Sequence, residues 1–110
     1  MASSQKTVDF IVDQIASAGS IRSRKMFGEY AIYCDEKVVA LVCDDELFVK
    51  ITEAGRAMLD TIDEAQAYPG AKPSFRIAGE LWEDREFLTK LIRTTCHTLP
   101  VPKKKQRKSR

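Results

Sequence analysis

The sequence has little of what most catalytic and metal sites are built from. It contains one histidine and three cysteines among 110 residues, and no two cysteines form a CxxC pair. A structural zinc site needs about four closely spaced ligands, so we expect neither a metal nor a cofactor. The sequence also lacks GxSxG, GxxxxGKS/T and GxGxxG, the signatures of a hydrolase nucleophile, a phosphate loop and a dinucleotide site. We therefore expect a protein that is not an enzyme.

Long apolar runs are absent as well. No stretch approaches the roughly 20 apolar residues of a membrane helix, and the first residues, MASSQKTVDF, lack the regions of a secretory signal. Cys34 and Cys43 are predicted at opposite ends of one hairpin strand, roughly 20 Å apart at about 3.4 Å per residue, which is too far for a disulfide. Reduced thiols are typical of intracellular proteins, and we expect a cytoplasmic protein without membrane contact.

Charge is distributed unevenly along the chain. The net charge is +2, but residues 1–102 combine 12 basic with 16 acidic residues, a net charge of −4. This predicts one domain at 1–102 and a disordered basic tail at 103–110. The tail either contacts nucleic-acid phosphates, without sequence preference, or only keeps the protein in solution. Its basic residues are Lys103, Lys104, Lys105, Arg107, Lys108 and Arg110.

Helical spacing of apolar residues predicts a helix near each end of the domain. Val8, Ile11 and Ile15 share one side of the first helix, which Ser4 or Thr7 begins and Gly19 ends. The last helix is predicted at about 84–98. Its apolar side consists of Leu88, Leu91, Ile92, Thr95 and Leu99. A short helix is predicted at 53–62, capped by Thr52, and His97 is expected to be exposed.

Strands are predicted between these helices. Alternating apolar residues, interrupted by the turn sequences CDEK and CDDE, favour strands at about 25–34, 38–43 and 47–51. A fourth strand is predicted at 75–79 and a short fifth at 80–82. The sequence thus predicts an α+β fold in two layers. Its order is helix, three strands, helix, strand, helix, with an antiparallel sheet of four to five strands.

The turn lengths assign side chains to the two faces of this sheet. A two-residue turn at 35–36 and a three-residue turn at 44–46 place Val39, Leu41 and Cys43 on the helix-covered face. The opposite face then consists of Phe27, Glu29, Ala31, Tyr33, Val38, Ala40, Val42, Phe48 and Lys50. A solvated face is usually more polar. This face is therefore predicted either to lie under a helix or to bind a protein partner or a second copy, with Phe27, Tyr33 and Phe48 as anchors.

The segment KMFGEYAIYCDEKVVALVCDDELFVKITEAG (25–55) resembles the core motif of the TfoX N-terminal domain family. YPGAKPSF and WEDREFLTKLIR continue the likeness, which covers about residues 5–100. The resemblance implies a compact α+β domain with an antiparallel sheet. Longer members resemble regulators of bacterial competence-gene transcription that act with a partner transcription factor, and no catalytic residues carry over from the family.

Three functional hypotheses follow. The first is a small non-enzymatic regulatory or adaptor protein that acts through protein–protein contacts, in transcriptional regulation of the competence type. The second is a nucleic-acid-binding protein that uses the tail at 103–110. The third is an enzyme, which would require a polar cleft around 67–74 containing acids from 83–86.

Overall fold

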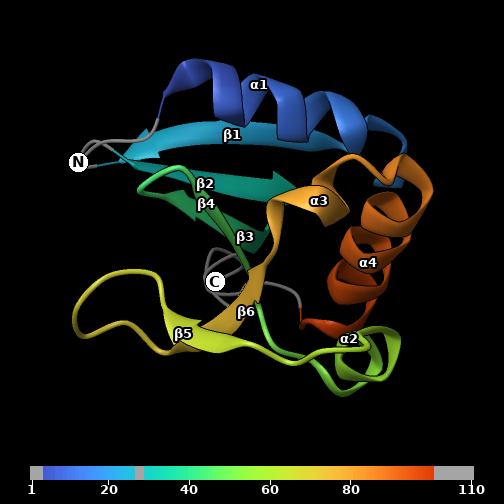
Figure 1. The fold of residues 1–110 in the computed structure, drawn as a ribbon. Coiled ribbons are helices and arrows are strands. Elements are labelled where there is room, and N and C mark those ends of the chain that lie inside the picture. Colours follow the sequence, from blue (N-terminus) through green and yellow to red (C-terminus); the bar gives the residue numbers. More distant parts are fainter. Residues whose placement is uncertain (1–3, 27–28, 101–110) are drawn as a thin grey trace, which may run out of the picture.

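The fold is a six-stranded sheet packed against helices (Figure 1). The structure, a computed structural model, describes residues 4–26 and 29–100. The strands are β1 (Ile21–Met26), β2 (Glu29–Cys34), β3 (Lys37–Cys43), β4 (Glu46–Val49), β5 (Glu64–Gln66) and β6 (Pro73–Ile77). They lie in the order β1-β2-β3-β4-β6-β5, and every neighbouring pair is antiparallel. The predicted α+β class is confirmed, although the sheet has more strands than the four to five expected.

The three longest helices that the structure describes begin at a residue whose side chain caps them. The helices are α1 (Gln5–Gln14), the 3-10 helix η1 (Ala16–Ala18), α2 (Glu53–Met58), α3 (Gly79–Trp82) and α4 (Arg85–Thr98). The side chains of Ser4, Thr52 and Asp84 each accept a hydrogen bond from the backbone amide three residues on, at the starts of α1, α2 and α4. No helix among residues 4–26 and 29–100 is long and apolar enough to cross a membrane.

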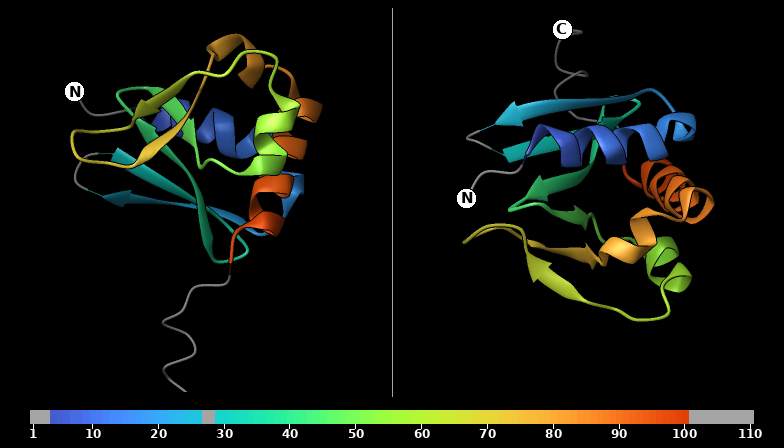
Figure 2. Two further views of the ribbon diagram at one scale, coloured as in Figure 1. Left: turned by 90° about the horizontal axis from the view of Figure 1, so that it is seen from below. Right: turned by 45° about the horizontal axis from the view of Figure 1, so that its top comes forward.

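The core lies between α1, α4 and one face of the sheet. Figures 1 and 2 show α1 running along β1 and β2, with α4 close to α2. The largest fully buried side chains come from both layers. They are Phe75, Ile11, Ile15, Ile32, Leu47, Leu88, Leu91, Ile92, Val8, Val39, Val42 and Val49. The predicted apolar sides of the first and last helices therefore face the sheet, and their burial supplies the main driving force for folding.

The predicted strand at 25–34 is in fact parts of two strands. β1 pairs with β2 in an antiparallel hairpin, with Lys25 opposite Tyr30 and Met26 opposite Glu29. The β1 sequence, IRSRKM, has no alternating apolar pattern because β1 is an edge strand, and all its side chains after Ile21 are exposed. Polar, exposed edges of this kind are common because they limit edge-to-edge association.

The register of β3 also differs from the prediction. A bulge between Ile32 and Tyr33 shifts the β2–β3 pairing by one residue, and the β3–β4 turn has two residues because Cys43 pairs with Glu46. Ala40 and Val42 therefore lie on the helix-covered face. A one-residue shift moves every side chain beyond it to the other face of the sheet. The two errors cancel in β4, where Leu47 and Val49 belong to the core cluster as expected.

The segment after α2 contains two further differences. Residues 79–82, which overlap the predicted short fifth strand, form α3 instead. β5 was not predicted, because its three residues are mostly exposed and pair only with β6 at the sheet edge. The fourth predicted strand, at 75–79, is found as β6 and ends at Ile77.

Candidate functional site

The residues predicted to anchor a partner lie in different environments. Phe27 lies outside the described residues, as does the tail at 103–110. Tyr33 is half-buried, with the Arg22 guanidinium 4.6 Å from the centre of its ring. Phe48 is only 5% exposed, so its ring offers little surface to a partner.

The sheet face that carries these residues is more polar than predicted. Arg22 lies opposite Tyr33 and Arg24 opposite Ala31, so β1 adds two exposed arginines to it. Half-buried Leu41 lies on this face as well, opposite Phe48. The face is therefore a mixed surface, because β1 adds charge to a predicted set that contained only Glu29 and Lys50 as charged residues.

A groove at one end of the sheet is a stronger candidate. It has a volume of about 840 Å³ and is lined by the β3–β4 turn, the chain after α2, the end of β6 with α3, and the start of α4. We call it the acidic groove. A concave site of this size, lined by apolar side chains with a few polar groups, is typical of a binding site.

The wall of the acidic groove is largely apolar. Half-buried side chains pack against the core and also line the groove. They are Met58, Leu59, Leu81, Trp82 and Phe87. The indole nitrogen of Trp82 donates to the Ile77 carbonyl oxygen at 3.0 Å, which satisfies its polar group and fixes the ring orientation. These side chains provide apolar contact area at fixed positions.

The charged residues of the groove are mostly acidic. Six are acids, namely Asp45, Glu46, Asp60, Asp63, Glu80 and Asp84, and Arg76 is basic. Arg76 forms ion pairs with Asp63 at 2.9 Å and with Glu46 at 3.7 Å. The hydrogen bond and the charge of Asp63 raise the pKa of Arg76 above its ordinary value. Asp60 and Glu80 have exposed carboxylates without an ion pair to any described residue.

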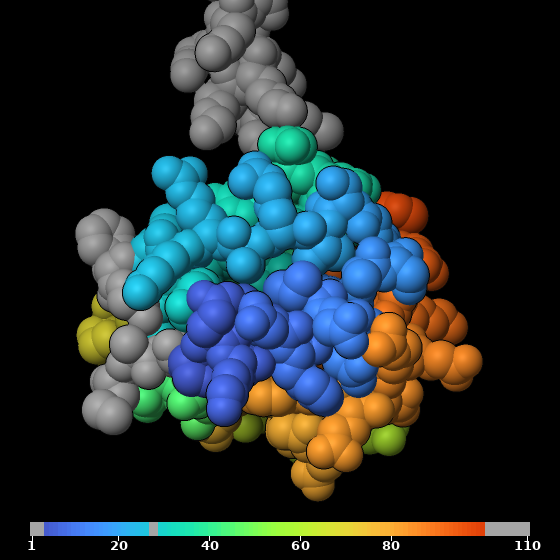
Figure 3. All heavy atoms as spheres, turned by 90° about the horizontal axis from the view of Figure 1, so that it is seen from above, coloured from blue at the N-terminus to red at the C-terminus, as the bar shows by residue number. Residues whose placement is uncertain are grey.

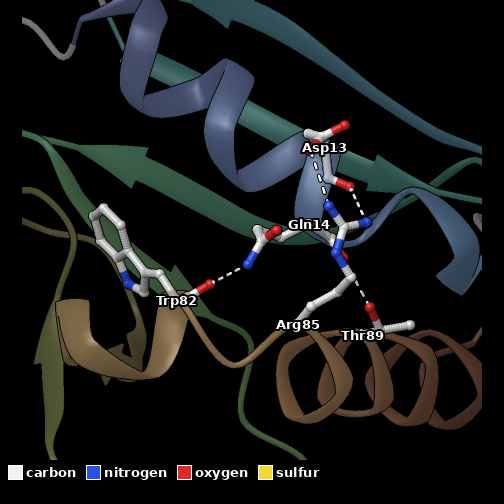
Figure 4. Close-up of polar contacts among 5 residues, drawn as sticks. All are labelled: Asp13, Gln14, Trp82, Arg85 and Thr89. Atoms are coloured by element: carbon white, nitrogen blue, oxygen red, sulfur yellow. Dashed lines mark hydrogen bonds and ion pairs between the residues drawn. The ribbon is translucent and has the colours of Figure 1, made fainter.

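Contacts between α1 and the α3–α4 junction hold one wall of the groove in place (Figure 4). Gln14 donates from Nε2 to the Trp82 carbonyl oxygen at 2.8 Å, and Thr89 donates from Oγ1 to the Gln14 carbonyl oxygen at 2.8 Å. Arg85 donates to the backbone oxygen and the carboxylate of Asp13. Figure 3 shows the end of α1 meeting α3 and the start of α4 at the surface. This wall of the groove is therefore attached to the core helices rather than carried on a free loop.

Only one of the acids predicted for an enzyme cleft lines this groove. Among residues 83–86, Asp84 lines it, but its carboxylate accepts from the Phe87 amide at 3.0 Å as the helix cap. No residue of 67–74 lines the groove.

The three cysteines are free and buried. Burial raises the pKa of Cys43 to about 11, with smaller contributions from Glu29 and Asp44. Burial, followed by contacts with Cys96 and the charge of Asp35, raises the pKa of Cys34 to about 12. Both thiols are therefore protonated at neutral pH and weak as nucleophiles. His97 is exposed whereas the neighbouring Cys96 is buried, so the two side chains do not form a nucleophile–base pair.

Comparison with known proteins identifies the family of the chain. The profile of the TfoX N-terminal domain matches residues 13–98, from the end of α1 to the end of α4. The chain is also 37% identical, over 110 residues, to an uncharacterized 12.7 kDa protein in the trpE 5′ region of Spirochaeta aurantia. That alignment covers 100% of this chain and 95% of the relative. The chain belongs to the TfoX N-terminal domain family.

Proposed function

We propose that this protein is a small non-enzymatic regulatory or adaptor module that binds a protein segment in the acidic groove. The segment it would accept carries apolar side chains flanked by lysine or arginine. The observation that carries the proposal is the combination of a fixed apolar wall with a largely acidic set of charges in one groove.

The apolar and the acidic residues of the groove would contribute to such a complex in different ways. Burial of apolar side chains against Leu81, Trp82 and Phe87 would supply most of the binding free energy. Asp60 and Glu80 would select for basic neighbours and speed the encounter, because exposed charges influence specificity and association rate more than affinity. The net charge of −4 on residues 1–102 acts in the same direction.

The biological setting we propose is transcriptional regulation of the competence type, in the cytoplasm. Membership of the TfoX N-terminal domain family supports this setting. The groove would then contact a partner such as a transcription factor.

A peptide selection tests the proposal because it does not require the partner to be identified first. Peptides selected on the intact chain should be enriched in apolar residues next to lysine or arginine. The double substitution Asp60→Lys and Glu80→Lys should weaken their binding by about ten- to thirtyfold, since each reversed charge costs about 1 kcal/mol. Glu83→Lys is the matched control, because Glu83 is an exposed neighbouring acid that does not line the groove.

Two results would contradict the proposal. One is equal binding of the selected peptides by the intact chain and the double variant. The other is the absence of any specific partner in a pull-down from bacterial lysate, together with strictly monomeric behaviour in solution.

A further inference from the structure

Two adjacent residues, Cys34 and Asp35, meet the sequence-distant Cys96 at the other end of α4 from the acidic groove. Cys34 ends β2, Asp35 begins the following turn, and Cys96 lies in the last turn of α4. Their ligand atoms, the two Sγ atoms and a carboxylate oxygen, all lie within 4.8 Å of one another. Phe87 in the groove and Cys96 are separated by nine helical residues, about 14 Å along the axis, so this cluster is distinct from the groove.

Several contacts hold the three groups in this arrangement. The Cys96 thiol donates to the Cys34 carbonyl oxygen at 3.2 Å. The Ser20 amide donates to Asp35 Oδ1 at 2.8 Å, and the Asp35 amide donates to the Ser20 carbonyl oxygen at 2.9 Å. Lys37 Nζ donates to the Cys96 carbonyl oxygen at 2.8 Å, which fastens the end of α4 to β3. The cluster is therefore supported by the backbone on three sides.

Gly19 leaves space beside these groups. A Cβ atom at this position would lie 2.8 Å from Cys34 Sγ, and 3.1 and 3.2 Å from the two carboxylate oxygens of Asp35. Any larger residue would therefore crowd the thiol and the carboxylate together.

From this placement we infer that Cys34, Cys96 and Asp35 form a binding site for one thiophilic divalent cation, zinc or cadmium. Thiolate ligands select such metals, whereas magnesium and calcium prefer sites built from oxygen alone. On binding, the two S–H bonds break, two protons pass to the solvent, and two metal–sulfur bonds form. Asp35 contributes a carboxylate oxygen, and the fourth tetrahedral position is open to water.

The spacing required is close to the spacing present. Tetrahedral zinc with Zn–S bonds of about 2.3 Å holds two sulfurs about 3.8 Å apart, and a sulfur and a carboxylate oxygen about 3.6 Å apart. Cys96 Sγ lies 3.9 Å from Asp35 Oδ2. The other two separations are at most 4.8 Å, about 1 Å above the spacing that the metal requires.

Such a metal would join the sheet to the last helix. Cys34 and Cys96 are 62 positions apart in sequence, and a cation that binds only the folded chain stabilises it. The metal site and the proposed function of the groove are independent of each other. An experiment that contradicts one of them leaves the other standing.

Cobalt and cadmium binding to the reduced, metal-free full chain tests the inference. Both metals give thiolate-to-metal charge-transfer absorption, and we expect one metal per chain and a higher melting temperature. Cys34→Ser and Cys96→Ser should each weaken binding more than about a hundredfold. Cys43→Ser is the matched control, because Cys43 is a buried free thiol outside the cluster, and it should bind as the intact chain does.

A second pair of variants keeps the test valid if the serine variants do not fold. Asp35→Asn should reduce the affinity about tenfold. Asp44→Asn, the equivalent first residue of the β3–β4 turn with a similar positive φ of 55°, should leave it unchanged. The inference is overturned if the intact chain gives no charge-transfer band. It is also overturned if both serine variants still bind as the intact chain does.

Discussion

The hydrogen bond from Thr89 to the end of α1 gives the sharpest test of how the groove wall is held. Thr89→Val replaces the hydroxyl with a methyl group of similar size and keeps a β-branched residue in the helix. Thr89 is 7% exposed as a whole residue. Its hydroxyl donates to the Gln14 carbonyl oxygen at 2.8 Å. That carbonyl belongs to the last turn of α1, whose carbonyls have no amide four residues further on in the helix.

The magnitude follows from the loss of one buried hydrogen bond. Such a bond contributes about 1 kcal/mol net, and an acceptor left without its partner adds a further cost, so we expect a loss of about 1–2 kcal/mol. For a domain of this size, that corresponds to a decrease in melting temperature of about 5–10 °C. The free energy of unfolding is measured by urea denaturation monitored by circular dichroism.

Thr98→Val on the same helix is the control for this prediction. Thr98 is exposed, and its hydroxyl donates to the Thr94 carbonyl oxygen within α4 at 2.9 Å. Its substitution should change the free energy of unfolding by less than about 0.5 kcal/mol. Equal effects of the two substitutions would refute the reasoning, because the Gln14 contact would then contribute nothing beyond the removal of a helical hydroxyl.

Two further predictions concern other parts of the chain. Because burial raises the pKa of the Cys43 thiol from 9.0 to about 11 in the folded chain, its contribution to stability is fully present below pH 9 and is lost between about pH 9 and 11. Cys43→Ala should therefore make the free energy of unfolding fall less steeply over that range in denaturation series, and an unchanged slope would contradict this. Deletion of residues 103–110 should leave peptide binding by the groove unchanged. If a gel shift with DNA at low salt is seen for the intact chain and lost on deletion, the tail is a nucleic-acid-binding element. No shift for the intact chain excludes that second hypothesis.

The helices of the core were predictable because their signals are local. Ser4 and Thr52 act as caps, and apolar residues recur at helical spacing on one side of α1 and α4. Such signals need only a few neighbouring residues. The end of α2 was predicted less well, since the helix expected at 53–62 ends at Met58. The start of α4 is capped by Asp84, a residue type that is strongly preferred at this position.

The sheet was harder to predict because its pairing depends on single-residue events. A bulge at Ile32–Tyr33 has no signal in a run of uniformly apolar residues. Two acidic residues with positive φ, Asp44 and Asp45, close the β3–β4 turn, a conformation that is uncommon for residues other than glycine. Edge strands β1 and β5 lack alternating apolar residues, because edge strands often expose polar side chains.

Neither candidate site was predicted, because each is assembled from distant segments. The groove combines residues near 46, 60, 80 and 87. The thiol cluster joins residues 34 and 96 through the packing of α4 on the sheet. Sequence spacing relates Cys34 only to Cys43, across one predicted strand. Only the packing of the last helix against the end of β2 brings Cys96 to Cys34.

Whether the acidic groove binds the partner is tested by mapping a selected peptide onto the chain through the changes it causes in amide chemical shifts. If the acidic groove is the binding site, the shifts should change along 58–63 and 79–87, which contain most of its lining residues. They should stay constant at Tyr33 and Leu41, on the sheet face that the helices do not cover. Changes confined to Tyr33, Leu41 and their β1 neighbours would show that the sheet face is the binding surface and would contradict the account.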